Sequence, residues 1–160
     1  MPIQTAIFTF GDRYVSGGAK DEGGDILNAS CLKMGWEVVA RQVLGDDEQG
    51  IVVQLVQTAD SGVVDVIFTV DGIGIQTKDR VPEAMYQVCE KWLPGIPELI
   101  RNKAFEKSSL VALTRGVAGI RGKTLILNLP GSTTVVKDSM EVLRQILRQA
   151  VEQAKGTPGP

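Results

Sequence analysis

Residues 63–74 read VVDVIFTVDGIG, a mostly apolar run that ends in an aspartate and two glycines. A run of this kind, rich in β-branched side chains and bounded by turn residues, is typical of a strand buried on both faces of a sheet. We therefore expect residues 64–70 to form an interior strand. Glycine directly after a strand allows a tight turn toward the next helix, so Gly72 and Gly74 mark a loop at its end.

Strand-like and helix-like stretches alternate along the rest of the chain. The other predicted strands are residues 5–10, 36–44, 109–114 and 124–129, the last two joined by a glycine-punctuated connection over residues 116–122. Apolar side chains at helical spacing predict helices within residues 26–34, 51–56, 82–89 and 135–154. Such alternation favours one three-layer αβα domain with a mainly parallel central sheet, expected over residues 1–155. Residues 156–160 are expected to form a flexible tail.

The composition excludes several classes of function. The chain has 160 residues, a net charge of -2 and 43% hydrophobic residues, as expected for one domain with its own core. A nearly balanced charge gives no bulk attraction to nucleic acid or to a membrane surface, and no apolar run approaches the length of a membrane span. The two widely spaced cysteines, Cys31 and Cys89, are more typical of buried thiols in a reducing compartment than of a disulfide. These features predict a cytoplasmic protein with neither a nucleic-acid nor a membrane partner.

The chain contains no histidine. That absence removes histidine as a general base, the Ser-His-Asp triads and nearly every zinc site. Among the remaining charged side chains, Arg115 and Arg121 could supply positive charge to a bound phosphate, or they could lie in a solvated loop.

In a parallel sheet of this kind, ligands bind where the carboxyl ends of strands lead into helices. The loops after Phe10, Val70 and Leu129 are all rich in glycine or acidic residues, which indicates a site at this edge of the sheet. Backbone N–H groups that glycine exposes near a helix start can bind phosphate, although a purely structural turn explains the same residues. After Leu129, residues 130–132 read PGS at a helix start, where Ser132 binds a phosphate or caps the helix.

Two acidic residues, Asp46 and Asp79, are the strongest candidates for a functional role. N-capping of the helices that follow them is the alternative role for both. A larger set of carboxylates could face the same sheet edge: Asp12, Asp21, Asp71 and Asp79. Carboxylates clustered beside a phosphate loop indicate Mg²⁺.

Residues 113–132 read LTRGVAGIRGKTLILNLPGS and closely resemble the pattern SR-x-x-AG-x-x-x-x-TLI-x-N-x-PG of the molybdenum cofactor adenylyltransferase family. Residues 65–84 and 94–101 resemble two further patterns of that family, and Asp12 and Asp46 fall in shorter ones. The family includes bacterial molybdopterin-binding proteins and the N-terminal domain of gephyrin. The chain is identified as a member by this resemblance, which covers about residues 4–155 in the right order and spacing.

The resemblance implies adenylyl transfer from Mg-ATP to the terminal phosphate of molybdopterin, with release of pyrophosphate. It implies catalytic roles for Asp46 and Asp79, with Asp79 also a candidate ligand of Mg²⁺. The residues implied to bind the nucleotide are Asp71, Gly72 and Gly74, and those implied to bind the substrate are Asp12, Arg115, Pro130, Gly131 and Ser132. Such a reaction proceeds mostly by positioning and charge neutralisation, so it needs no histidine. The resemblance also implies a homotrimer.

The glycine loop departs from the family pattern, because TTGGTG reads TVDGIG at residues 69–74 and Asp71 stands in place of a glycine. A carboxylate near a polyphosphate is repelled by on the order of 4 kcal/mol per charge pair at about 4 Å and an effective dielectric of about 20, unless a cation intervenes. Asp71 is therefore expected either to oppose nucleotide binding or to hold Mg²⁺. Two functions stay open: an active molybdopterin adenylyltransferase, or a catalytically impaired paralogue that binds pterin or nucleotide or serves as an interaction subunit.

Overall fold

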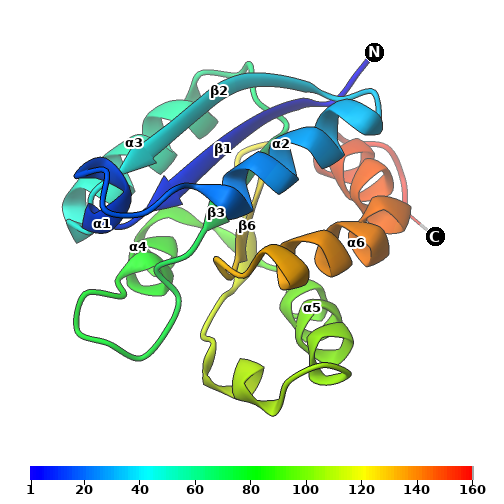
Figure 1. The fold of residues 1–160 in the computed structure, drawn as a ribbon. Coiled ribbons are helices and arrows are strands. Elements are labelled where there is room, and N and C mark those ends of the chain that lie inside the picture. The colour runs from blue at the N-terminus through cyan, green and yellow to red at the C-terminus, as the bar shows by residue number, and fades with distance from the viewer. Residues whose placement is uncertain (160) are drawn as a thin grey trace.

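The computed structural model describes residues 1–159 and shows a central sheet between two layers of helices (Figure 1). The sheet has six strands in the order β2-β1-β3-β6-β5-β4. The strands are β1 (Gln4–Phe10), β2 (Glu37–Leu44), β3 (Val66–Val70), β4 (Lys91–Trp92), β5 (Ala118–Arg121) and β6 (Thr124–Leu129). Strands β2, β1, β3 and β6 run parallel, whereas β5 is antiparallel to β6 and β4 is antiparallel to β5. The predicted three-layer αβα fold with a mainly parallel sheet is confirmed.

The helices divide between the two faces of the sheet. They are α1 (Asp12–Val15), α2 (Glu22–Lys33), α3 (Glu48–Asp60), α4 (Val81–Val88), α5 (Gly95–Phe105), the 3-10 helix η1 (Ser109–Leu113) and α6 (Thr133–Ala154). Apolar side chains of α2, α5 and α6 pack on one face, and those of α3 and α4 pack on the other. The predicted long C-terminal helix is α6, whose Leu143 and Leu147 are fully buried.

Strand β3 lies in the interior of the sheet and is buried on both sides. Val66, Phe68 and Val70 pack in the layer of α2, α5 and α6, and Ile67 packs in the layer of α3 and α4. Successive side chains of a strand point to opposite faces, so an apolar run without alternation fits this position. The predicted interior strand is confirmed, with its start at Val66.

The prediction of a strand over residues 109–114 is wrong, because this segment forms the 3-10 helix η1. The hydroxyl of Ser108 accepts a hydrogen bond from the Leu110 amide (3.2 Å), and only Val111 of the helix is buried. The strand beside β6 is instead β5, within the predicted glycine-rich connection. Gly122, at φ +60°, permits the two-residue turn that returns the chain from β5 into β6 as a hairpin.

Both cysteines are free thiols, as predicted, but only Cys31 is buried as expected and Cys89 is partly exposed. Cys31 lies in α2 and is fully buried. Cys89 follows α4 with an extended backbone, so the predicted helix over residues 82–89 ends one residue early, where the chain leaves to form β4. Within residues 1–159, no helix is both long enough and apolar enough to cross a membrane. Pro160, the last residue of the predicted tail, lies outside the described residues.

Candidate functional site

A polar cavity of about 170 Å³ opens at the carboxyl ends of β1 and β3. Its lining comprises Phe10, Gly11, Arg13, Asp46, Asp71, Gly72, Gly74, Gln76, Lys78 and Asp79. Five of the predicted site residues therefore lie around one cavity, although they follow two different strands, β2 and β3. We call this cavity the acidic pocket, because three carboxylates and two cationic side chains line it.

Asp12 and Asp46 join the start of α1 to the loop after β2. The Asp12 amide donates to the Asp46 carboxylate, and the Asp46 amide donates to the Asp12 carboxylate, both at 3.1 Å. Helix α3 is capped by Asp47 instead, whose carboxylate accepts from the Gly50 amide at 2.8 Å. Asp46 is therefore not a helix cap, and its hydrogen bonds with Asp12 hold it at the pocket instead.

Asp79 closes a turn inside the loop between β3 and α4. Its carboxylate accepts a hydrogen bond from the Gln76 amide (2.9 Å), and its own amide donates to the Gln76 carbonyl (3.0 Å). The N-cap of α4 is Arg80, and no side chain caps that helix. A Cβ atom at Gly74 would lie 2.7 Å from the Asp79 carboxylate, so this glycine makes room for the acid. The helix-capping alternative for Asp79 is wrong.

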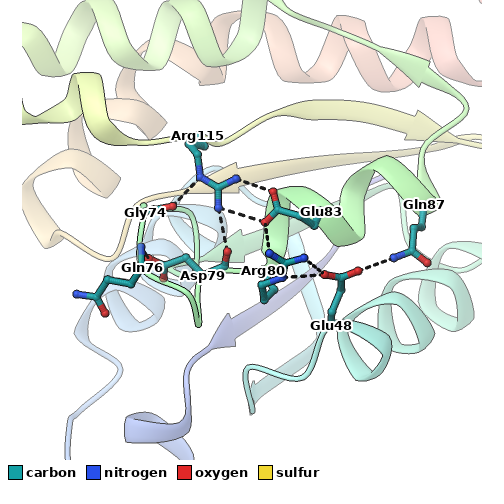
Figure 2. A network of polar contacts seen from close by, with 8 residues as sticks. All are labelled: Glu48, Gly74, Gln76, Asp79, Arg80, Glu83, Gln87 and Arg115. Atoms are coloured by element: carbon teal, nitrogen blue, oxygen red, sulfur yellow. Dashed lines mark hydrogen bonds and ion pairs between the residues drawn. The ribbon is translucent and has the colours of Figure 1, made fainter.

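Arg115 holds the loop that carries Asp79 (Figure 2). Its guanidinium donates to the carbonyl of Gly74 at 2.7 Å and to that of Asp79 at 2.9 Å, and it pairs with Glu83 of α4 at 2.5 Å. The next contact outward is Arg80 with Glu48, at the start of α3. Arg115 does not line the acidic pocket. These contacts make it a positioning residue for the loop, and its predicted contact with substrate stays a prediction.

Glu83 gives this network a pH dependence that can be measured. The hydrogen bond from Arg115 lowers the pKa of the Glu83 carboxyl from its usual 4.5. Because the folded-state pKa is the lower one, the pair stabilises the fold above the unfolded-state pKa, and this stability is lost as the pH falls through the folded-state value. We expect wild type to lose more stability than Glu83→Gln as the pH falls below the usual carboxyl pKa of 4.5, as measured by urea unfolding. Equal losses would contradict this role.

Three of the predicted substrate-binding residues, Pro130, Gly131 and Ser132, lie at the start of α6, next to the acidic pocket. A Cβ atom at Gly131 would come 2.9 Å from the Asp71 carboxylate, because β3 and β6 are neighbours that end at the same edge. Ser132 caps α6, and its hydroxyl accepts from the Val135 amide at 3.4 Å. Pro130 lines a separate small cavity with Arg101. The structure thus brings Gly131 to Asp71, whereas Pro130 and Ser132 do not line the acidic pocket.

No group of three or more acidic or cysteine side chains within residues 1–159 is arranged to hold a metal ion. Asp21, which was expected to join the carboxylate cluster, caps α2 instead and accepts from the Gly24 amide at 3.0 Å. Mg²⁺ commonly binds through one or two carboxylates together with phosphate oxygens. The carboxylates around the acidic pocket, those of Asp46, Asp71 and Asp79, therefore fit an ion that arrives with a nucleotide rather than a preformed metal cage.

Arg13 and Tyr14 also lie at this edge, although neither was predicted as a site residue. Arg13 lines the acidic pocket and forms an ion pair with Asp71, and the Tyr14 hydroxyl donates to the same carboxylate at 2.7 Å. The signal that could have found Arg13 is its position two residues after Gly11, at the start of the short helix α1 that follows β1.

A larger cavity of about 480 Å³ lies between α2 and α6, with Lys33, Trp36 and Arg144 in its lining. None of the predicted site residues lines it. The smaller acidic pocket is the better candidate because it lies at the carboxyl edge of the sheet, where several loops meet.

Residues 6–149 match the sequence family described as "Probable molybdopterin binding domain". The chain is 32% identical to the molybdopterin adenylyltransferase of Helicobacter pylori strain ATCC 700392, over 96% of this chain and 89% of that protein. It is 35% identical to the molybdenum cofactor synthesis protein cinnamon of Drosophila melanogaster over 93% of this chain, and it spans only 25% of that longer protein. The solved structure of the molybdopterin biosynthesis enzyme MoaB from Thermus thermophilus superimposes with a TM-score of 0.89 at 34% identity, covering 98% of both chains.

Proposed function

We propose that this chain, which belongs to the molybdopterin-binding domain family of molybdenum cofactor biosynthesis, adenylylates molybdopterin with Mg-ATP. The observation that carries the proposal is the meeting of Asp46, Asp79 and the glycine loop around one pocket. These residues come from separate stretches of the chain, so local structure alone does not account for their proximity.

The proposed reaction joins a terminal phosphate oxygen of molybdopterin to the α-phosphorus of ATP. The bond between the α- and β-phosphates breaks, and pyrophosphate leaves with the electron pair. Gly72 and Gly74 let the loop backbone approach the phosphates, and Asp46 and Asp79 position the reactants. Mg²⁺, when bound with the nucleotide, would neutralise phosphate charge, and the carboxylates of the acidic pocket are the groups available to it.

The pterin phosphate is proposed to lie on the side of the pocket next to α6. Gly131 borders Asp71 there, and the N-terminus of a helix favours an anion. Asp12 is hydrogen-bonded to Asp46 at the same edge of the sheet. The full proposed set for the substrate is Asp12, Arg115, Pro130, Gly131 and Ser132. We extend the proposal to a cytoplasmic homotrimer on the resemblance to the family, and sedimentation of the purified protein tests the trimer.

A second function is favoured by one observation: Asp71 lines the pocket where the family pattern has a glycine. In that case the chain is a catalytically impaired paralogue that binds pterin or nucleotide, or serves as an interaction subunit.

One assay distinguishes the two functions. Purified protein is incubated with molybdopterin, ATP and Mg²⁺, and pyrophosphate release and the mass of the pterin product are followed. The proposed function is expected to give equal amounts of pyrophosphate and adenylylated molybdopterin. Molybdopterin that binds without pyrophosphate release would instead support the impaired paralogue.

A further inference from the structure

Asp71 adopts a backbone conformation that side chains rarely take. Its φ is +68°, and among residues 1–159 it is the only residue other than glycine with a positive φ. Aspartate tolerates this left-handed region better than most residues, but still less well than glycine. The side chain at this position therefore depends on contacts that hold it in place.

Three donors converge on the Asp71 carboxylate. The Arg13 guanidinium and the Tyr14 hydroxyl both bind Oδ2, the hydroxyl at 2.7 Å, and the Gly72 amide donates to Oδ1 at 3.0 Å. Burial, together with the hydrogen bond to Asp71, raises the pKa of Tyr14 to about 12, so its hydroxyl remains a donor at neutral pH. A guanidinium, a hydroxyl and a loop amide are the groups that proteins use to bind phosphate.

Arg13 is held against Tyr14 as well as against Asp71. Its guanidinium carbon lies 4.8 Å from the centre of the Tyr14 ring, and a guanidinium nitrogen donates to the Tyr14 oxygen at 2.9 Å. Both Arg13 and Asp71 line the acidic pocket, so their ion pair is formed at the place proposed for the nucleotide.

We infer that Arg13, Tyr14 and the Gly72 amide form an anion-binding cradle that Asp71 occupies in the free protein, so that a phosphate group enters it only with a divalent cation. The cation binds the Asp71 carboxylate in place of Arg13, and the Arg13 guanidinium is then free to bind the phosphate. Asp71 thereby selects cation-complexed polyphosphates against free ones. This inference rests on the proposed nucleotide site in the acidic pocket.

The test is calorimetric titration with pyrophosphate and with ATP, each with and without Mg²⁺. Asp71→Asn removes the charge and keeps the shape, and asparagine also tolerates a positive φ. We expect this variant to bind Mg²⁺-free pyrophosphate about tenfold more tightly than wild type, because repulsion by one carboxylate has been removed. The gain in pyrophosphate affinity on adding Mg²⁺ should be smaller in Asp71→Asn than in wild type, by the same factor.

Two further variants make the test specific. In Arg13→Met/Asp71→Asn the gain is expected to disappear, because the cradle has lost its guanidinium. Asp60→Asn is the matched control, since Asp60 also pairs with an arginine, Arg121 at 3.0 Å, but lies outside the acidic pocket. Its affinities should equal those of wild type. Asp71→Gly, which adopts the positive φ without strain, replaces Asp71→Asn if thermal unfolding shows that the latter is not folded.

The outcomes separate this inference from the proposed function. The inference is overturned if wild type binds Mg-ATP but Asp71→Asn binds Mg²⁺-free pyrophosphate no better, or if the gain survives the loss of Arg13. If neither wild type nor any variant binds a phosphate ligand with or without Mg²⁺, the proposed nucleotide site itself fails and the inference fails with it.

Discussion

Gly72→Ala is expected to lower the free energy of unfolding by about 3 kcal/mol, from a left-handed backbone and a steric overlap together. Gly72 has φ +74°, and a Cβ atom there would lie 2.6 Å from Cγ2 of Val81. Val81 is fully buried at the start of α4, and a β-branched side chain has little freedom to turn away. The loop is therefore forced out of position, and nucleotide binding in the acidic pocket should be lost with it.

Gly62→Ala provides the matched control for this variant. Gly62 has nearly the same backbone angle, φ +76°, but a Cβ atom there would meet nothing within 4 Å. Only the left-handed conformation then costs stability, about 1 kcal/mol, and nucleotide binding should be unchanged. Urea unfolding and calorimetric titration of both variants measure the two effects. If Gly72→Ala costs no more stability than Gly62→Ala, the packing of the loop on Val81 has no energetic weight.

Arg115→Met is expected to slow the proposed adenylyl transfer by about 100-fold, because displacement of reacting groups by about 1 Å has an effect of that size. The substitution leaves the carbonyls of Gly74 and Asp79 without their donors and Glu83 without its partner. Losing hydrogen bonds that involve a charged group should also lower the free energy of unfolding by about 2 kcal/mol. The measurements are kcat/KM and urea unfolding.

Arg121→Met separates the loss of stability from the loss of function. Arg121 also pairs with a carboxylate, that of Asp60, and donates to a carbonyl, that of Val88 at 3.1 Å, but neither partner belongs to the loop between β3 and α4. Its removal should lower stability by a similar amount and leave kcat/KM near that of wild type. If both variants lost activity equally, the positioning role of Arg115 would be refuted.

The fold could be predicted wherever one strand or helix carries a clear apolar period. The run in β3 and the spacing of Leu143 and Leu147 in α6 each fit a single kind of element. The apolar residues of 109–114 fit a strand just as well in isolation. In the structure β3 and β5 occupy both edges of β6, so a strand over residues 109–114 has no place beside β6.

Residue types and the family pattern could predict which residues belong to the site and at which edge of the sheet they lie, but not the contacts between them. Asp46 and Asp79 lie at the predicted edge, but their hydrogen bonds to Asp12 and Gln76 depend on loop geometry that no spacing encodes. The pairing of Arg13 with Asp71 joins residues that are far apart in the chain. Such contacts follow from tertiary structure, so sequence reasoning could recognise that Asp71 is unusual but not what compensates its charge.

The thiols of Cys31 and Cys89 react slowly as long as the protein stays folded. Burial raises the pKa of both Cys31 and Cys89 to about 12, so at neutral pH neither is a thiolate, the form that reacts with oxidants and alkylating reagents. Cys31 has no exposed surface at all, and a reagent reaches it only when α2 separates from the sheet. The rate at which Cys31 is alkylated in the native protein therefore measures how often that helical layer opens.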